Sequence, residues 1–406
     1  MSVFYMFGNP VVLLNDADLI ESVLISNRDA YYKDNPVDAL MPVLTESSPN
    51  INNGEQWAHK RKINPLTQEY VADWYRDQLP AMRTMFRGKF DTMVSQTASS
   101  ATALQPELQR IIFDAFSVAA VGKTIGDQAY DDFIAIATQG SKRMLSAMPF
   151  GPELSASAVR SRKRFLGNFA ACLEQARADK ASERQDLVSL IVRHGTELPD
   201  TSIQSELGNI FYGGAFSVPS SLVTTMYCLT QNPDEEKKLI EELACLGDDF
   251  GYEDLMACRH LDHVLREGMR WRTAVPLFDR KVKKDSSTQL GGRTLPAGTH
   301  VFITSWLLHW NKGQWPEPSK YRPDRWANGV AEANLLGSGY FFPLGRGPRM
   351  CMGADFAMFT MKLYLATLYS KYRAETGKGQ NYDAGQKYYF GVRMPWGVAT
   401  RITPAP

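Results

Sequence analysis

A long helical stretch between residues 201 and 231 limits the possible folds of this chain more than any other feature of its sequence. Thr201 and Ser202 can cap its first turn, and Asn232-Pro233 ends it. At about 1.5 Å per residue such a helix is roughly 46 Å long, which is enough to cross a large domain. We therefore expect a large domain that this helix crosses.

The middle of this stretch contains residues that helices disfavour. Gly213 and Gly214 are poor helix formers. Pro219 cannot donate a hydrogen bond to the carbonyl of Ala215, and its ring clashes with that carbonyl. The sequence therefore predicts a kink. A kink that is merely tolerated and a kink at a functional site remain equal alternatives on this evidence alone.

The rest of the pattern predicts a mainly α fold with a small β region. We expect one domain over residues 1–406, with a small sheet assembled from both ends of the chain. The β-rich parts are expected near 1–15, 276–305 and 385–406, the helical parts near 16–275 and 306–375, and a loop at 43–54. Helix breaks are expected near Gly122, Gly140, Pro149-Phe150-Gly151-Pro152 and Gly167, and further helices at 16–26, 254–272 and 354–372.

Composition argues against several classes of protein. Of 406 residues, 44% are apolar and 22% are charged, which is ordinary for a globular protein, and the net charge of +1 argues against a polyanion binder. The five cysteines are scattered without a CxxC pair, so we expect neither a disulfide framework nor a zinc site. No apolar run is long enough to cross a membrane. We expect a soluble, cytoplasmic monomer that binds no nucleic acid.

The segment from Phe342 to Gly353 carries the strongest chemical signal. Its glycines let the backbone approach another group closely. Cys351 stands just before a predicted helix, where the helix dipole and free N–H groups favour a thiolate, and Arg349 adds positive charge. Such a thiolate suits a soft metal or heme iron. The plainer alternative is a buried core cysteine, which is the usual fate of a lone Cys.

This segment resembles the heme-binding loop of the cytochromes P-450, whose pattern is Phe-x-x-Gly-x-Arg-x-Cys-x-Gly. Gly347, Arg349, Cys351 and Gly353 fall on the pattern, and Leu344 replaces the usual Phe. The resemblance implies that Cys351 is the axial ligand of a b-type heme. It also implies the cytochrome P-450 fold, a helical triangular prism with the heme between the long central helix and the cysteine loop.

Further motifs follow in the order that this family has. Glu267 and Arg270 match its ExxR pair, which places a carboxylate and a guanidinium on one face of a helix. Pro323-Asp324-Arg325-Trp326 stands at the family's Pro-Glu-Arg-Phe position, so Arg325 is expected to complete a network with this pair. The resemblance covers the chain from residue 4 to its end.

The resemblance also implies which residues hold the heme. Trp57-x-x-x-Arg61 is similar to the family's motif on the helix that meets the heme propionates, and both side chains are hydrogen-bond donors. A basic surface helix with one anchoring Trp is the alternative reading of this motif by itself. The cofactor-binding residues expected from the resemblance are Trp57, Arg61, Arg280, Arg349, Gly345 and Gly353.

The central helix departs from the family. Members usually carry Ala/Gly-Gly-x-Asp/Glu-Thr over the oxygen site, where the acid and the alcohol guide protons. Here the aligned residues are Gly213 to Ser217, so Phe216 replaces the acid and Ser217 the threonine. Phe216 cannot carry a proton, whereas Ser217 keeps a hydroxyl. The catalytic residues expected from the resemblance are therefore Cys351, Ser217 and Gly214, with protons supplied by water, the substrate or another group.

The resemblance implies a heme-thiolate monooxygenase that oxidises a mostly apolar small molecule with O2. Electrons are expected from a redox partner, an NADPH reductase or a ferredoxin, and Trp57-x-x-x-Arg61 looks more like the reductase-coupled branch. The pocket residues expected are Phe211, Gly213, Phe216, Leu277, Phe278 and Tyr389, with the loop at 43–51. The alternatives are a partner-independent peroxygenase, isomerase or dehydratase, a non-enzymatic heme sensor, and a chain anchored through a preceding N-terminal segment.

Overall fold

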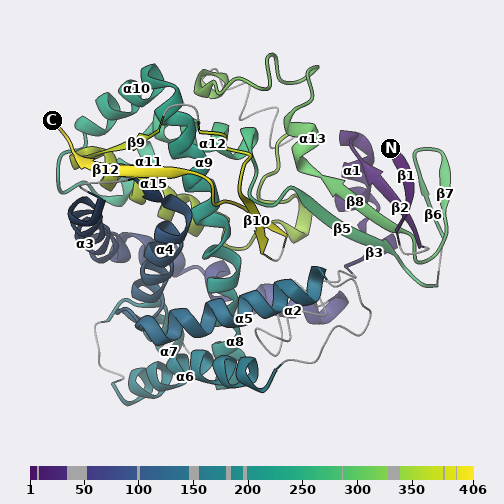
Figure 1. Cartoon of the computed structure of the whole chain (residues 1–406). Helices are drawn as coiled ribbons and strands as arrows, with labels where there is room; N and C mark the ends of the chain where they lie inside the picture. Colours follow the sequence, from purple (N-terminus) through teal and green to yellow (C-terminus); the bar gives the residue numbers. More distant parts are fainter. Residues whose placement is uncertain are drawn as a thin grey trace.

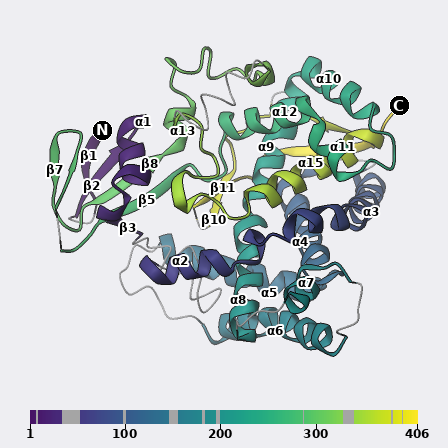
Figure 2. The same cartoon turned by 180° about the vertical axis from the view of Figure 1, so that it is seen from behind.

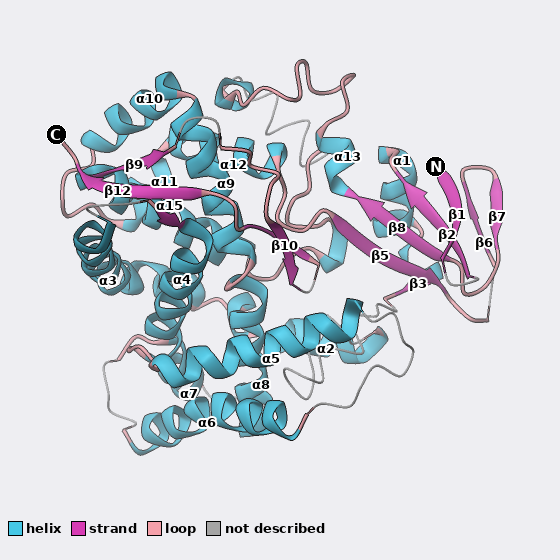
Figure 3. Cartoon of the chain, in the orientation of Figure 1, coloured by secondary structure: helices cyan, strands magenta, loops and turns pink. Residues whose placement is uncertain are grey.

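A computed structural model describes residues 1–6, 9–33, 53–97, 101–145, 155–179, 184–194, 199–285, 287–327, 339–377, 380–389 and 391–406. Helices form most of this part of the chain, and the strands gather mainly at one end of it (Figures 1 and 3). The N-terminus lies with those strands, whereas the C-terminus lies at the opposite end of the molecule (Figures 1 and 2). The expected mainly α fold with a small β region is confirmed.

The helices follow one another along most of the chain. They are α1 (Ala17–Glu21), α2 (Gly54–Ile63), α3 (Val71–Thr97), α4 (Leu104–Val121), α5 (Asp127–Leu145), α6 (Ala156–Ala178), α7 (Leu187–Arg193), α8 (Asp200–Gly214), α9 (Ser217–Gln231), α10 (Pro233–Ala244), α11 (Tyr252–Ala257), α12 (Arg259–Trp271), α13 (Ser305–His309) and α15 (Ala354–Lys371). A π-helical turn (Ser22–Ser26) continues α1, and short 3-10 turns cover Arg28–Ala30, Pro65–Thr67, Pro323–Trp326 and Gly347–Arg349.

The strands of the described residues form four small sheets. They are β1 (Ser2–Met6), β2 (Asn9–Leu14), β3 (Tyr31–Tyr32), β4 (Thr102–Ala103), β5 (Leu277–Val282), β6 (Thr288–Leu290), β7 (Arg293–Leu295), β8 (His300–Thr304), β9 (Tyr372–Thr376), β10 (Gln386–Tyr389), β11 (Val392–Pro395) and β12 (Ala399–Pro404). The largest sheet has the order β1-β2-β8-β5-β3, with β2 and β8 parallel and the other pairs antiparallel.

One expectation about the sheet is wrong. In the described residues the two ends of the chain do not share a sheet, because β12 pairs with β9 and β4, and β10 with β11. The N-terminal hairpin instead adds to β8, in the register Val11 to His300 through Leu14 to Ile303. Val11 and Leu14 are fully buried, as is Ile303, so this pairing covers an apolar face.

The expected helix over residues 201–231 is divided in two. α8 ends at Gly214 and α9 begins at Ser217, so Ala215 and Phe216 separate them. Pro219 therefore lies in the first turn of α9, where backbone N–H groups have no partner within the helix. The break thus removes the conflict that the proline would cause inside one continuous helix.

Other helix boundaries differ from the sequence pattern in small ways. The helix expected over 254–272 is α11 and α12, with Cys258 between them. Gly122 ends α4 in the left-handed region at φ 75°, as a C-terminal glycine does, but Gly140 and Gly167 lie inside α5 and α6. Packing of the buried faces outweighs the roughly 1 kcal/mol that a helical glycine costs. The expected break at 149–152 and most of the loop at 43–54 lie outside the described residues.

Close packing of α12 on α9 depends on a glycine. A Cβ at Gly268 would stand 2.3 Å from the Thr225 hydroxyl oxygen and 3.4 Å from the Thr225 Cα, and Thr225 is fully buried. A side chain therefore cannot be added there without moving the two helices apart. The helix that carries Glu267 and Arg270 is held against α9 at this point.

We predict that Gly268→Ala lowers the free energy of unfolding by about 1–3 kcal/mol, because the added methyl group overpacks the contact with Thr225. Gly167→Ala is the matched control, since a Cβ there meets nothing within 4 Å, and it should stabilise α6 by about 0.5–1 kcal/mol. Denaturant unfolding of both variants and of Gly268→Ala/Thr225→Ala measures the effect. Equal stability of the two single variants would contradict the packing argument.

Candidate active site

Cys351 lies at the end of a tightly closed loop. Its N–H donates to the carbonyl of Leu344 at 2.8 Å, and the Gly345 N–H donates to the carbonyl of Phe342 at 3.0 Å. Gly345 has φ 78°, a conformation that L side chains rarely adopt, so the turn requires glycine there. The loop thus presents Cys351 just before α15, as the sequence predicts.

Gly347 serves the loop in a different way. A Cβ there would lie 2.6 Å from the Leu24 carbonyl oxygen, and its φ is 72°. The cysteine loop therefore approaches the backbone that follows α1 as closely as a glycine allows. Gly353 has φ −93°, and a Cβ there would make an ordinary 3.5 Å contact with Leu66, so neither space nor conformation requires a glycine at 353.

The Cys351 thiol is accessible, yet protein surrounds it. Its side chain is exposed, and burial nevertheless raises the pKa of the thiol above its ordinary value. A hydrogen bond from the Gly353 N–H and the charge of Arg61 act in the opposite direction and lower that pKa. Both observations agree if the sulfur faces a space inside the fold. A cation bound there would favour the thiolate outright.

Three of the expected cofactor-binding residues converge on this loop. On α2, Trp57 and Arg61 are one turn apart, and the Arg61 Nη1 donates to the carbonyl of Met350 at 2.8 Å. The Arg349 guanidinium lies 4.6 Å from the centre of the Trp57 ring, and its Nη2 donates to Asn53 Oδ1 at 3.0 Å. The structure therefore gathers one indole and two guanidinium groups around the cysteine.

Arg280 lies on β5, outside the group formed by Trp57, Arg61 and Arg349. It and Lys33 both lower the pKa of Asp279, which burial raises overall. Lys33 is tied by both backbone groups to the Asn53 side chain, which also binds Arg349. Arg280 Nη1 donates to the Asp279 carbonyl at 2.6 Å, and the charges of Arg280 and Lys33 both act on the Asp279 carboxylate.

Glu267 is the centre of a buried polar network. Arg270 donates to it twice, at 2.9 and 2.8 Å, and Arg325 Nε donates at 3.1 Å. Glu267 and Arg270 are both fully buried. The Trp326 indole N–H and the Arg322 backbone N–H also donate to this carboxylate, at 3.1 and 2.9 Å, which the motif alone did not predict. Five donors satisfy a charge that would otherwise be costly to bury.

His309 connects this network to the cysteine loop. Its carbonyl accepts from Arg270 Nη1 at 2.9 Å, and its Nε2 accepts from the Phe342 N–H at 3.1 Å. Burial lowers the pKa of His309 to about 3, so the ring is neutral and can accept this hydrogen bond. The start of the loop is therefore fixed to the ion network through one imidazole.

The middle of the central helix differs from the expectation in one respect. A Cβ at Gly214 would lie 2.1 Å from the Phe116 ring, so that space is filled, whereas a Cβ at Gly213 would meet nothing within 4 Å. Gly213 is exposed although the residues before it on α8 are mostly buried. The open position thus lies at Gly213, and Gly214 serves packing against α4. The Ser217 hydroxyl donates to the Gly213 carbonyl at 2.6 Å.

Phe216 does not face that opening. It is 1% exposed and stacks between Phe133 (ring centres 5.2 Å apart) and Tyr389 (5.6 Å). Phe211 is also fully buried, in contact with Phe113 and other core rings. These two members of the expected pocket therefore belong to the core.

The remaining expected pocket residues have accessible side chains. Leu277 is 45% exposed, and Phe278 and Tyr389 are half-buried. The expected loop at 43–51 lies outside the described residues.

The sequence analysis did not single out Glu206 on α8. This acid is fully buried and pairs with Lys60 of α2 at 3.3 Å. The signal that could have found it is its position, since Glu206 and Gly213 are seven residues, or two turns, apart and share a face of α8.

The donor set fits a heme. An exposed cysteine suits its iron, and the indole and guanidinium donors at the cysteine loop suit its two carboxylates. In the part of the chain that the structure describes, no three His, Cys, Asp or Glu side chains form a group that could hold a metal ion by themselves. Within the same residues, no helix is both long and apolar enough to cross a bilayer.

Comparisons with known proteins show the family of this chain. The family described as Cytochrome P450 matches residues 1–388. Cytochrome P450 3A28 of Bos taurus is 24% identical over 90% of this chain and 76% of its own length. Cytochrome P450 72A397 of Kalopanax septemlobus is 26% identical over 92% of this chain and 76% of its own. A solved structure, retinoic acid bound cyanobacterial CYP120A1, superposes with a TM-score of 0.83 over 99% of this chain and 92% of its own, at 20% identity, which shows the fold.

We predict that Arg61→Ala and Arg349→Ala each speed the loss of heme about tenfold, because each removes a charged donor beside the cysteine loop. Transfer of heme to an excess of apomyoglobin measures the rate. Arg280→Ala should have a smaller effect, and Arg160→Ala, a change of an exposed residue of α6, is the control. The same release rate in all four variants would contradict the assignment of these arginines.

Proposed function

This chain belongs to the cytochrome P450 family, and from that membership we propose that it oxidises a mostly apolar small molecule with O2 and electrons from a separate redox partner. The family makes the protein a heme-thiolate oxidoreductase of the monooxygenase class. Heme b is the form of the cofactor that we propose. When bound, the heme supplies the iron at which dioxygen is activated.

The observation that carries this proposal is the environment of Cys351. Cys351 is exposed, and its backbone N–H donates to the Leu344 carbonyl. Arg61 donates to the carbonyl of Met350, the residue before Cys351. We propose that Cys351 holds the iron and that Trp57, Arg61 and Arg349 bind the heme carboxylates, with Arg280 near them. The Glu267, Arg270 and Arg325 network would keep the loop in place through His309.

The substrate side is proposed to lie along the open face of the central helix. Gly213 offers space there, and Leu277, Phe278 and Tyr389 offer accessible apolar surface. Such a lining suits a mostly apolar ligand with few polar groups. For the electron donor we propose a reductase rather than a ferredoxin, because Trp57-x-x-x-Arg61 resembles the reductase-coupled branch.

Proton supply is where this chain would depart from its relatives. Phe216 has no ionisable group and its ring is enclosed by Phe133 and Tyr389, so position 216 delivers no proton. Ser217 donates its own proton to the Gly213 carbonyl, which leaves its oxygen free to accept from water or a substrate hydroxyl. We propose that ordered water or the substrate itself delivers the protons, positioned by Ser217.

Loss of the acid also favours a second function. A partner-independent peroxygenase, isomerase or dehydratase that acts on peroxides needs no proton relay from position 216. The two functions are separated by the source of oxygen and electrons. The first consumes O2 with NAD(P)H and a reductase, and the second turns over an organic peroxide without a reductant.

We predict that the ferrous–CO complex of the wild type absorbs at the position typical of thiolate ligation, and that Cys351→His loses this band, because a thiolate donates electron density strongly to the iron. The wild type should also oxidise NAD(P)H and consume O2 when a surrogate reductase is added. Cys258→Ser, a change of a buried cysteine, is the control. An unchanged band in Cys351→His would refute the ligand assignment, and turnover of organic peroxide alone would favour the second function.

We predict that Ser217→Ala releases several-fold more hydrogen peroxide per NAD(P)H consumed than the wild type, because the hydroxyl that positions water is lost. Ser217→Thr should stay within about twofold of the wild type. Ser221→Ala is the matched control, since Ser221 also donates to a carbonyl four residues earlier on α9, that of Ser217. Equal peroxide release in Ser217→Ala and Ser221→Ala would show that Ser217 positions no proton donor.

A further inference from the structure

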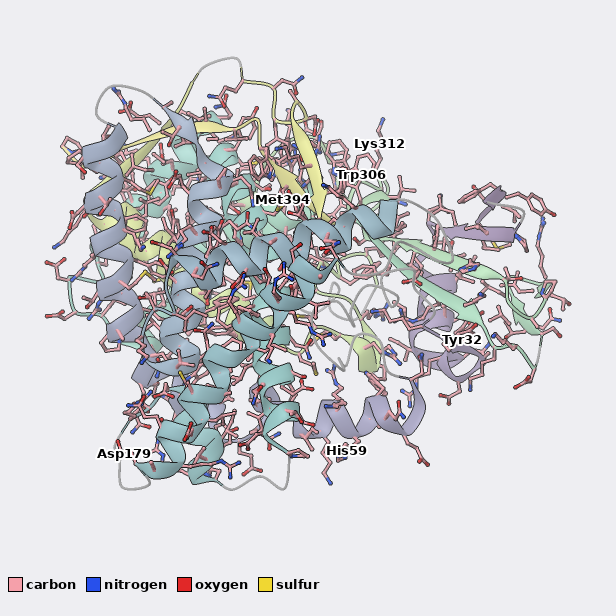
Figure 4. The ribbon with its side chains drawn as sticks, turned by 60° about the horizontal axis from the view of Figure 1, so that its bottom comes forward. Tyr32, His59, Asp179, Trp306, Lys312 and Met394 are labelled. Atoms are coloured by element: carbon pink, nitrogen blue, oxygen red, sulfur yellow. The ribbon has the colours of Figure 1, made fainter. Side chains whose placement is uncertain are left out.

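α2 carries two of the proposed heme-holding residues, yet it has no apolar attachment to the core. None of its side chains is buried, and seven of its ten residues are other than the apolar Trp57, Ala58 and Ile63. Figure 4 labels His59 on this helix, at the rim of the molecule in that view. A helix without a buried face must be positioned by polar contacts, because hydrophobic burial supplies no fixed orientation.

The strongest of these contacts leads to one carboxylate on the central helix. Glu206 on α8 is fully buried, and its Oε1 lies 3.3 Å from the Lys60 ammonium of α2. Its Oε2 accepts from the Asn64 amide at 2.9 Å, and Asn64 is the residue that ends α2. The Glu206 carboxylate therefore binds both Lys60 in the last turn of α2 and Asn64 at its C-terminal end.

Burial of this carboxylate is costly by itself. Desolvation raises the pKa of Glu206, although Lys60, Asn64 and Asn209 act to lower it. A buried charge of this kind is retained only with partners that compensate it. Lys60 reaches it with a side chain that is 13% exposed, so α2 brings the compensating cation.

The other end of the contact lies at the cysteine loop. Arg61, the residue after Lys60, donates to the Met350 carbonyl, and Met350 precedes Cys351. Glu206 shares a face of α8 with Gly213, two turns further on. α2 thus spans from the open face of the central helix to the loop that carries the thiol, and it lies beside α8 in Figure 2.

We propose that Glu206 is a positioning residue, which docks α2 on the central helix and thereby places Trp57 and Arg61 at the cysteine loop. This inference rests on the proposed role of those two residues in holding the heme. It assigns Glu206 no contact with heme or substrate. Its effect passes through Lys60 and Asn64 to α2, and from α2 to the loop.

The test uses the heme-loaded protein and the isosteric variant Glu206→Gln. We expect amide hydrogen exchange in residues 54–63 to speed up about tenfold and heme transfer to apomyoglobin to speed up by a similar factor, because a charged hydrogen-bonded contact is lost. Asp114→Asn is the matched control. Asp114 is likewise buried and paired with a lysine, Lys89 at 2.6 Å, but it joins α3 to α4.

Lys60→Met gives a second route if Glu206→Gln fails to fold, since it removes the cation without changing α8. The double variant Glu206→Gln/Lys60→Met should lose no more protection in residues 54–63 than the single variant that loses more, because both changes remove the same contact. Exchange in α2 that rises no more in Glu206→Gln than in Asp114→Asn would overturn the inference. Faster exchange with unchanged heme release would support the docking role and instead refute heme binding by Trp57 and Arg61.

Discussion

The buried charge of Glu267 is the constraint on which the rest of the site depends. A carboxylate with no exposed surface is tolerated because five donors from α12 and the 316–326 segment surround it. Arg270 and Arg325 also bind the carbonyls of His309, Pro316, Glu317 and Lys320, so their donors are satisfied as well. Removal of Glu267 would leave two guanidinium groups in the interior without their anion. The network therefore fixes the position of α12 relative to the 316–326 segment.

That rigidity is transmitted to the thiol through few atoms. The His309 imidazole fixes the Phe342 N–H, the Phe342 carbonyl fixes Gly345, and the Leu344 carbonyl fixes Cys351. Each step is a single hydrogen bond at about 3 Å. Because burial keeps the imidazole neutral, the first step does not change with pH in the range where proteins work. The position of the sulfur is thus set by backbone groups, and little by the cysteine side chain itself.

Most of the fold and the positions of the motif residues near Cys351 could be predicted, because short motifs fix them. The ExxR spacing places Glu267 and Arg270 on one helix face in any sequence, and the glycine pattern requires the turn before Cys351. The two-part central helix could not be predicted, since it depends on whether packing tolerates Pro219 inside a helix or in its first turn. The role of Gly214 depends on Phe116, about a hundred residues earlier, and no local pattern reveals that contact. Glu206 was missed for the same reason, because its partners lie on α2.

The polar character of α2 has a consequence for how the protein acquires its cofactor. A segment that buries no side chain is held by polar contacts, so its detachment would uncover Glu206 and leave the apolar core folded. The rest of the molecule, with its aromatic clusters and the Glu267 network, can then assemble first. Loading would follow through the gap that α2 leaves, and closure of this one helix would be the final step of maturation.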